Sequence, residues 1–150
     1  MIAIGGDHSA LELKAEIMAH LEKRGEAFED FGTYTKESCD YPDIARAVCR
    51  AVLEGRCDRG ILICGTGIGI SIAANRFRGI RAALCSDCFS AKATREHNDA
   101  NVLVMGARVI GPGLACQITD TWLDTPFSEE ERHKNRLKRK SVDRQNGSFV

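Results

Sequence analysis

Short apolar runs alternate with amphipathic stretches along most of the chain. Five runs rich in small or β-branched apolar residues predict strands that are buried within a sheet. The stretches between them repeat apolar residues every three or four positions, which is typical of helices with one face against a core. The predicted strands cover residues 2–5, 27–31, 61–64, 80–85 and 102–105, and the predicted helices cover about 9–25, 43–54, 70–75, 87–96, 114–123 and 128–142.

This regular alternation predicts an α/β fold, in which helices cover both faces of a parallel sheet. Crossovers between parallel strands are right-handed. The expected architecture is therefore a single-domain, Rossmann-like three-layer sandwich with a five-stranded parallel sheet. Segment 27–31 is the most polar of the predicted strands, so we expect it near an edge of the sheet.

Two helices carry local start or stop signals. The first is expected to begin with a capping box of Ser9 and Glu12 and to stop at Gly25. The last has the same spacing in Ser128 and Glu131, but it offers little apolar surface for burial within one chain. We therefore expect this C-terminal helix to pack on a partner subunit.

Composition excludes several classes of function. The chain is long enough for one domain, 1–150, and its 43% hydrophobic and 28% charged residues are ordinary for a soluble globular protein. The formal net charge is zero, so nucleic acid is not an expected partner. No apolar stretch approaches the roughly 18 residues of a membrane span, and the N-terminus meets Asp7 too early for a signal peptide. Seven cysteines without a framework spacing indicate reduced thiols and a cytoplasmic location.

The strongest chemical signal is the segment 60–69, GILICGTGIG, in which an apolar strand ends in a thiol and a glycine-rich turn follows. Cys64 is expected at the carboxyl end of its strand, where open α/β sheets bind their ligands. The glycines leave backbone N–H groups free to point at an anion. A thiol beside such dipoles is a candidate base or nucleophile. The sequence therefore predicts chemistry at Cys64 with an anion held nearby.

Two polar clusters are candidates for the same site. Asp7 and His8 follow the first strand, at the edge where Cys64 is expected, and could bind sugar or phosphate; a helix cap beside a solvated histidine is the alternative. His97 and Asn98 could supply an acid–base imidazole and an amide donor, with helix termination as the alternative. Their loop precedes a strand and so lies at the amino edge. Reaching Cys64 would require a second subunit or a long fold-back.

Three arginines are candidates for binding an anion. Arg132 and Arg136 lie four positions apart, so they project from one face of the last helix and together suit a dianionic phosphate. Arg108, just after the fifth strand, could be a third. The alternative is a solvated charged face, with the glutamates at 129–131 as partners.

Patterns for metals and cofactors are weak. Cys85 and Cys88 have the spacing of a metal or redox pair, but no second pair accompanies them, so no metal is expected. The glycine turn is not a dinucleotide fingerprint, because Ile70 stands three positions after Gly67 where a small residue belongs. No P-loop sequence occurs. No cofactor is expected.

Taken together, these segments closely resemble the B-type ribose-5-phosphate isomerases, in the family that also holds galactose-6-phosphate isomerase subunits. The resemblance covers about residues 1–140, and the combination of motifs in this order is highly specific. It rests on Gly6-Asp7-His8, Asp40-Tyr41-Pro42, the segment 63–75, Arg95-Glu96-His97-Asn98-Asp99, Gly106-Ala107-Arg108-Val109, and Arg132-His133 with Arg136.

The resemblance implies interconversion of ribose 5-phosphate and ribulose 5-phosphate without metal or cofactor. It implies that Cys64 takes the proton from the carbon beside the carbonyl, that His97 assists opening of the furanose ring, and that Thr66 belongs to the catalytic group. Relatives with a glutamate base near the start of the third helix differ from this chain, which has no acid at 72–75. The substrate-binding residues that the resemblance implies are Asp7, His8, Tyr41, Gly65, Gly67, Ile68, Gly69, Asn98, Arg108, Arg132 and Arg136.

The resemblance also implies a homo-oligomer, dimer or tetramer, whose sites are shared between subunits, so that a partner chain can deliver His97. Three other functions stay open. The same chemistry could act on a six-carbon substrate such as allose 6-phosphate or galactose 6-phosphate. A non-catalytic sugar-phosphate or nucleotide sensor and a nicotinamide-dependent dehydrogenase are the alternatives from other classes.

Overall fold

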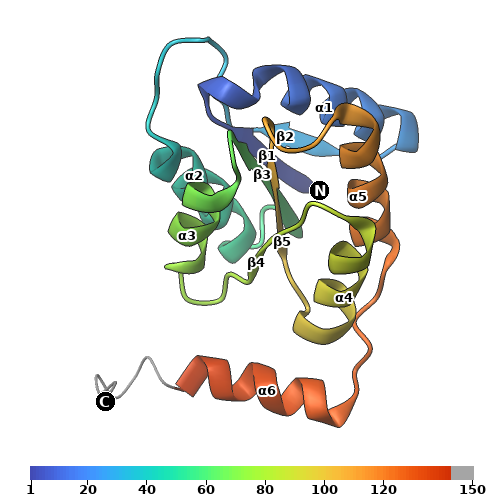
Figure 1. Ribbon diagram of the computed structural model, residues 1–150. Coiled ribbons are helices and arrows are strands. Elements are labelled where there is room, and N and C mark those ends of the chain that lie inside the picture. Colours follow the sequence, from blue (N-terminus) through green and yellow to red (C-terminus); the bar gives the residue numbers. More distant parts are fainter. Residues whose placement is uncertain (143–150) are drawn as a thin grey trace.

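In the computed structural model, which describes residues 1–142, a parallel sheet lies between two layers of helices (Figure 1). The five strands are ordered β2-β1-β3-β5-β4, and every neighbouring pair is parallel. The three central strands are almost wholly buried, as their apolar sequences require. The predicted α/β sandwich is confirmed. The strands are β1 (Ile2–Gly6), β2 (Phe28–Asp30), β3 (Arg59–Cys64), β4 (Ala82–Leu84) and β5 (Val102–Gly106).

Each helical layer has its own apolar core. On one face, α2 and α3 pack around Val48 and Ile70, and on the other, α1, α4 and α5 pack around Ile17 and Trp122. These four side chains are fully buried. The helices are α1 (Leu11–Arg24), α2 (Tyr41–Leu53), α3 (Ile68–Asn75), α4 (Cys88–Asn98), α5 (Pro112–Asp124) and α6 (Glu131–Val142), with a short 3-10 helix, η1 (His8–Ala10), before α1.

Most element ends differ from the prediction by one to three residues, and the two edge strands are the shortest. β2 lies at one edge, as its polar sequence predicted. β4 lies at the other edge, outside β5, because the chain crosses from β3 through α3 to the far side and returns through α4. Both edge strands keep only three residues, so their outer predicted residues belong to loops.

Both predicted capping boxes are wrong. Asp7 caps η1 instead, with its Oδ1 accepting from the N–H of Ser9 at 3.0 Å and from the Ser9 hydroxyl at 2.6 Å. At the last helix, the Ser128 hydroxyl accepts from the N–H of Glu130 at 3.4 Å, and α6 begins only at Glu131. In both places the side chain accepts from the N–H two residues later, instead of three residues later as in a capping box. The predicted stop at Gly25 is confirmed, with a φ of 73°.

A part-buried ion pair ties α1 to the edge of the sheet. The Lys14 side chain is only 5% exposed, and its Nζ donates to Asp30 Oδ1 at 2.8 Å and to the carbonyl of Thr33 at 2.7 Å. The ammonium and the carboxylate thus compensate each other's desolvation. This contact holds the loop after β2 against the helix that follows β1.

Candidate active site

The carboxyl ends of β1 and β3 lie side by side at the middle of the sheet. Gly6 pairs with Ile63, so Asp7 and Cys64 follow at the same edge, and the Asp7 N–H donates to the carbonyl of Ile63 at 3.1 Å. After β1 the chain runs to β2 at one edge of the sheet, and after β3 it runs to β4 at the other edge. Open α/β sheets bind their ligands at such a reversal. The fold therefore brings the Asp7–His8 segment to the Cys64 turn, as the sequence predicted.

Cys64 ends β3 with its thiol engaged by the turn that follows. The residue is only 5% exposed, and the N–H of Gly67 donates to its sulfur at 3.2 Å. The positive end of this N–H dipole therefore points at the sulfur atom. The thiol lies at the ligand-binding edge of the sheet, where the sequence predicts a base or nucleophile.

Four other thiols have pKa values raised by their surroundings. Burial in the apolar core raises the pKa of Cys49 to about 12 and that of Cys85 to about 11. Burial, followed by neighbouring carboxylates, also raises the pKa values of Cys57 and Cys116. These four thiols are therefore protonated at neutral pH and act as small core or surface side chains.

The turn after Cys64 is held rigidly by the end of β5. Hydrogen bonds continue beyond the paired strands, from the Ala107 N–H to the carbonyl of Cys64 at 2.8 Å and from the Arg108 N–H to that of Gly65 at 2.9 Å. Gly67 has a φ of 78°, which favours glycine, and a Cβ there would lie 2.4 Å from a Leu84 methyl group. The backbone of the turn therefore has one tightly packed position.

Helix α3 begins inside this turn, two residues earlier than predicted. The Thr66 hydroxyl accepts from the N–H of Ile68, the first residue of α3, at 3.2 Å. The remaining N–H groups of that turn have no partner within the helix and carry its partial positive charge. Gly69 lies against the Tyr41 ring, since a Cβ on Gly69 would be 2.6 Å from Tyr41 Cζ. Tyr41, at the start of α2, therefore borders the turn.

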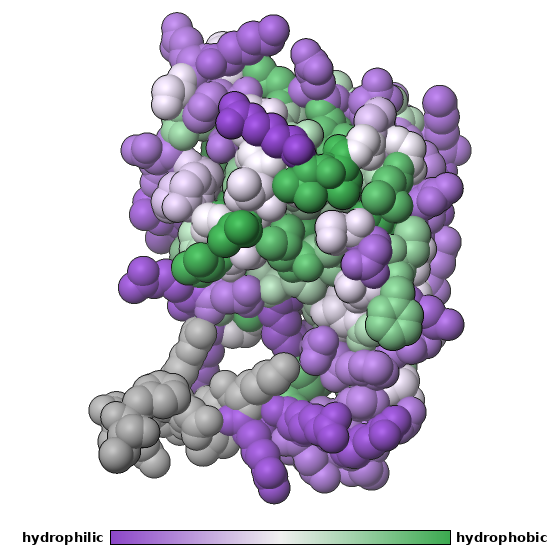
Figure 2. All heavy atoms as spheres, in the orientation of Figure 1, coloured by the Kyte–Doolittle hydropathy of each residue, from purple (hydrophilic) through white to green (hydrophobic). Residues whose placement is uncertain are grey.

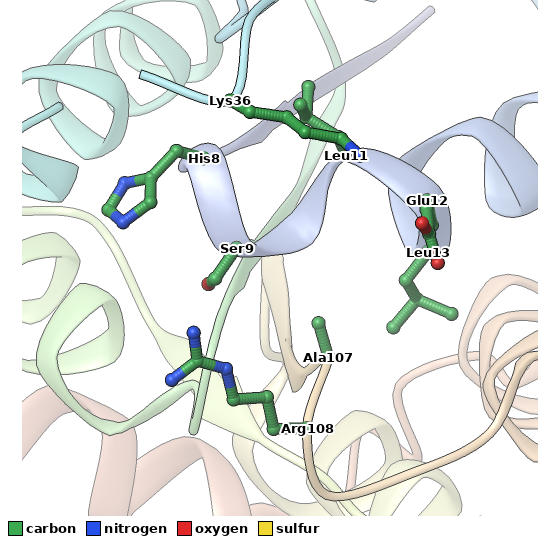
Figure 3. A pocket seen from close by; sticks show the side chains of 8 residues that line it. All are labelled: His8, Ser9, Leu11, Glu12, Leu13, Lys36, Ala107 and Arg108. Atoms are coloured by element: carbon green, nitrogen blue, oxygen red, sulfur yellow. The ribbon is translucent and has the colours of Figure 1, made fainter. Parts of the chain in front are cut away.

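A hollow of about 290 Å³ with basic side chains in its wall lies beside the turn (Figure 3). His8, Lys36 and Arg108 line it together with Ser9, and Glu12 is the one acidic side chain in its wall among residues 1–142. Figure 3 shows the guanidinium of Arg108 pointing toward Ser9 and the side on which His8 lies. A Cβ on Gly65 would lie 3.6 Å from Arg108 Cδ, so this arginine also contacts the turn. The arrangement suits an anion such as phosphate next to Cys64.

The backbone of the loop before α2 fixes the orientation of His8. The N–H of Cys39 donates to His8 Nδ1 at 3.3 Å. Because Nδ1 accepts, the proton of the neutral ring lies on Nε2. Nε2 is then the nitrogen that can donate to an anion.

His97 and Asn98 lie at the opposite edge of the sheet. They end α4, and β5 follows from Val102, which pairs with Gly60 at the start of β3. The length of β5, roughly 13 Å at 3.3 Å per residue, separates this edge from the one where Cys64 pairs with Gly106. The expectation that His97 lies at the amino edge is confirmed. One chain does not bring it to Cys64.

The last helix extends away from the body of the molecule (Figure 1). Arg132 and Arg136 are both exposed, and Arg132 Nε donates to Glu130 Oε2 at 2.7 Å. Glu130 is therefore a partner of Arg132, as the alternative reading of this face expected. α6 contacts α4, at the amino edge. Within one chain, these arginines lie apart from Arg108.

Neither a metal cluster nor a membrane span emerges from the part of the chain that the structure describes. In residues 1–142, no three side chains of His, Cys, Asp or Glu gather where they could hold a metal ion. None of the helices in this range is both long and apolar enough to cross a bilayer.

Sequence comparison matches this geometry to one family. The sequence profile described as "Ribose/Galactose Isomerase" matches residues 2–139. The chain belongs to the ribose/galactose isomerase family. The motifs on which the resemblance rested all lie within the matched range.

Relatives within the ribose/galactose isomerase family are similar over nearly their whole length. Ribose-5-phosphate isomerase B of Escherichia coli is 53% identical over 91% of both chains. D-Erythrulose-4-phosphate isomerase of Pectobacterium atrosepticum is 47% identical over 84% of both chains. The solved structure of ribose-5-phosphate isomerase B from Clostridium thermocellum superposes with a TM-score of 0.94 at 51% identity, and the match covers 98% of this chain and 99% of that one.

The sequence analysis did not identify four side chains that lie at the carboxyl or amino edge of the sheet, beside the candidate site residues. Ser9 and Lys36 line the hollow. Arg81 Nε donates to the carbonyl of Asn98 at 3.1 Å, and Arg95 Nη1 donates to Asp99 Oδ1 at 2.9 Å. The four-residue spacing of Arg95 and Asp99 was a visible signal for an ion pair on a helix. No local pattern announced Arg81, which comes from the loop before β4.

Proposed function

We propose that this chain is an aldose–ketose isomerase that interconverts ribose 5-phosphate and ribulose 5-phosphate. The observation that carries the proposal is the Cys64 thiol, with the Gly67 N–H on its sulfur and a helix N-terminus directly after it. Family membership and the 53% identity to ribose-5-phosphate isomerase B of Escherichia coli support the same reaction.

In the proposed reaction, the Cys64 thiolate removes the proton from the carbon next to the substrate carbonyl. The electrons of that bond form an enediolate, whose oxygen is stabilised by backbone N–H groups of the turn, Gly65 to Gly69, and by Asn98. The proton on the other enediolate oxygen moves to the former carbonyl oxygen, and the Cys64 thiol delivers the abstracted proton to the neighbouring carbon, which completes the exchange of aldehyde and ketone. Preorganised donors of this kind contribute a few kcal/mol each, or on the order of a hundredfold in rate. The Thr66 hydroxyl supports this turn through its bond to Ile68.

Binding of the phosphate group is assigned to side chains from both edges of the sheet. His8 and Arg108 line the hollow beside the turn, and we propose that Arg132 and Arg136 complete the phosphate site from a second copy of the chain. Asp7 and Tyr41, which border the same region, are proposed to contact sugar hydroxyls. Binding remote from the reacting carbons orients the substrate for proton transfer.

We further propose a homodimer in which each site is completed by His97, Asn98, Arg132 and Arg136 of the other copy. An apolar group of side chains lies exposed on the face toward the viewer in Figure 2 and is available for such a contact. Phe89 is 82% exposed and Ile72 is 61% exposed. The exposed apolar side chains of α3, β4 and the starts of α4 and α5 are Ile68, Ile72, Leu84, Phe89 and Leu114, with Val109 in the loop before α5.

The first experiment compares wild type with Cys64→Ala in an assay of ribose 5-phosphate isomerisation, with and without a chelator. Activity that resists the chelator and falls by about 10²- to 10⁴-fold in the variant supports the proposed base. Cys49→Ala is the matched control, because it removes a buried thiol from the core on the α2 side. Full activity of Cys64→Ala would rule out the thiol as base, and inactive wild type would rule out the substrate.

A substrate series tests the length of the sugar and the role of His97 together. The names of two relatives indicate five- and four-carbon substrates, so erythrulose 4-phosphate and six-carbon phosphates are compared with ribose 5-phosphate. An erythrose 4-phosphate cannot close a furanose ring, because the hydroxyl that would close it carries the phosphate. His97→Asn should therefore impair turnover of ribose 5-phosphate far more than that of the four-carbon pair. Equal losses on both would contradict a ring-opening role, and faster turnover of a six-carbon phosphate would replace the proposed substrate.

Mixing two inactive variants tests the shared site. Cys64→Ala and His97→Asn are each expected to be inactive alone, but a mixed dimer contains one site with both intact residues. Random exchange of subunits should restore about one quarter of wild-type activity, because half of the dimers are mixed and each has one intact site. No recovery after denaturation and joint refolding would contradict a site shared between subunits.

The seven free cysteines support a cytoplasmic location for this enzyme, where thiols stay reduced.

A further inference from the structure

The side chains of His97 and His133 stack on each other, and this contact joins α4 to α6. Their ring centroids lie 4.5 Å apart with an interplanar angle of 15°. His133 is only 3% exposed, whereas His97 is exposed. One face of the His97 ring is therefore covered by His133, and the rest of the ring remains open for a substrate.

His133 is unsuited to contact a substrate itself. Both of its ring nitrogens are buried, and neither has a hydrogen-bond partner within residues 1–142; the Glu130 carboxylate lies 3.9 Å from Nε2, beyond hydrogen-bond distance. A buried polar group without a partner costs stability, on the order of 1–3 kcal/mol. The side chain thus occupies this position at a cost, although a leucine or phenylalanine would fill the same space without it.

The backbone that carries His97 is already fixed from the other side. Arg81 Nε donates to the carbonyls of Asn98 at 3.1 Å and of Asp99 at 2.8 Å, while Arg95 Nη1 donates to the carbonyl of Ala100 at 2.6 Å. These bonds hold the end of α4 in place. The remaining freedom of His97 lies in its two side-chain torsions, which the stacked ring restricts.

We propose that His133 is a positioning residue, which holds the His97 imidazole in the orientation needed for the proposed opening of the sugar ring. It acts through the flat face of its ring rather than through its nitrogens. Because Arg132 and Arg136 lie on the same helix, the stack also sets where the phosphate-binding arginines stand relative to His97. This proposal rests on the proposed role of His97.

The geometry of α6 supports this role. Within residues 131–139, His133 alone is buried, so the helix is docked on α4 mainly through this side chain. Within residues 1–142, a single backbone hydrogen bond joins the preceding linker to α4, from the Ser128 N–H to the carbonyl of Glu96 at 3.3 Å. Loss of the stack would therefore free both His97 and the helix.

The test compares His133→Phe, which keeps a flat ring without nitrogens, with His133→Leu, which keeps apolar volume without a ring. We expect His133→Leu to lower kcat for ribose 5-phosphate by about tenfold to a hundredfold, as misplaced catalytic groups do. His133→Phe should restore most of kcat. His20→Leu, which changes a histidine of α1 paired with Asp120 of α5, is the control and should keep wild-type kcat.

A spectroscopic measurement follows the stack itself. The ring current of His133 shifts the NMR signals of the carbon-bound protons of His97, and this shift should persist in His133→Phe and vanish in His133→Leu. Wild-type kcat in His133→Leu, once the shift is lost, would overturn the proposal. So would a His133→Phe variant that keeps the shift yet is as slow as His133→Leu, because the nitrogens would then be required. Inactive wild type would refute the proposed function instead, and the shift would still test the stack.

Discussion

Gly106 offers a sharp test of how far the turn after Cys64 depends on its packing. A Cβ on Gly106 would lie 2.6 Å from the carbonyl oxygen of Thr66, against the 3.4 Å at which ordinary contact begins, so one of them must move by about 0.8 Å. The two nearest atoms, the carbonyl oxygen and carbon of Thr66, belong to the backbone, so no flexible side chain can absorb the shift. Gly106 has no positive φ, so the conflict in Gly106→Ala is steric alone.

A displacement of this size in the turn should cost about a hundredfold in kcat, because catalytic groups must be held to within about 0.5 Å. A hundredfold corresponds to about 2.7 kcal/mol of activation free energy. The overpacked site should also lose about 1–3 kcal/mol of unfolding free energy. Steady-state kinetics with ribose 5-phosphate and urea unfolding measure the two effects.

Gly113→Ala is the matched control, because a Cβ at Gly113 meets nothing within 4 Å. This glycine lies in the first turn of α5, so alanine there should keep kcat and leave stability unchanged or slightly higher. Gly106→Ala with wild-type kcat and ordinary stability would refute the argument that the turn must keep its present position. A loss of stability without a loss of kcat would confine the role of Gly106 to folding.

Three further predictions concern contacts around the sheet. Gly69→Ala should displace the Tyr41 ring and raise KM about fivefold in steady-state kinetics, which is the equivalent of one lost hydrogen bond. Tyr41→Phe should raise KM by a similar factor. An unchanged KM in both variants would show that Tyr41 is not part of the site. Lys14→Met should lower the free energy of unfolding in urea by about 1–3 kcal/mol, because the part-buried Asp30 carboxylate loses its ammonium partner, whereas Arg56→Met, which breaks an exposed pair, should cost less than about 1 kcal/mol. Burial and the stacked neighbouring ring lower the pKa of His133 below its ordinary value of 6.5, so the folded state favours the neutral form. The contribution of His133 to stability should therefore be fully present above pH 6.5 and fall on acidification, and this pH dependence should disappear in His133→Phe. An equal pH dependence of stability in the variant would contradict the assignment.

The sequence was sufficient to predict the elements that local patterns determine. The apolar run before Cys64 and the glycines after it predicted a buried strand and a ligand-binding turn, because both depend on residues next to each other in the chain. Gly25 ended α1 for the same reason. The position of His97 at the amino edge followed from the order of helix and strand alone.

Features that depend on distant residues were not predictable in this way. The place of β4 outside β5 is decided by which strands pair, and its three residues carry no signal for that choice. The capping by Asp7 required a 3-10 turn that a capping-box pattern does not describe. The stack of His97 on His133 joins residues 36 positions apart, on two helices whose docking no periodicity encodes.

The amino edge of the sheet is more elaborately built than the end of a helix requires. Asp99 adopts a φ of 45°, a conformation that costs a non-glycine residue energy, although a glycine would end α4 there without strain. Its carboxylate accepts from Arg95 at 2.9 Å and from Arg81 at 3.2 Å, and the Arg95 side chain is only 7% exposed. A buried guanidinium is unfavourable unless all its partners are in place, so the network gives precision rather than stability. That precision is of use only if the edge positions side chains for a task. We therefore favour a functional role for His97 and Asn98 over simple helix termination.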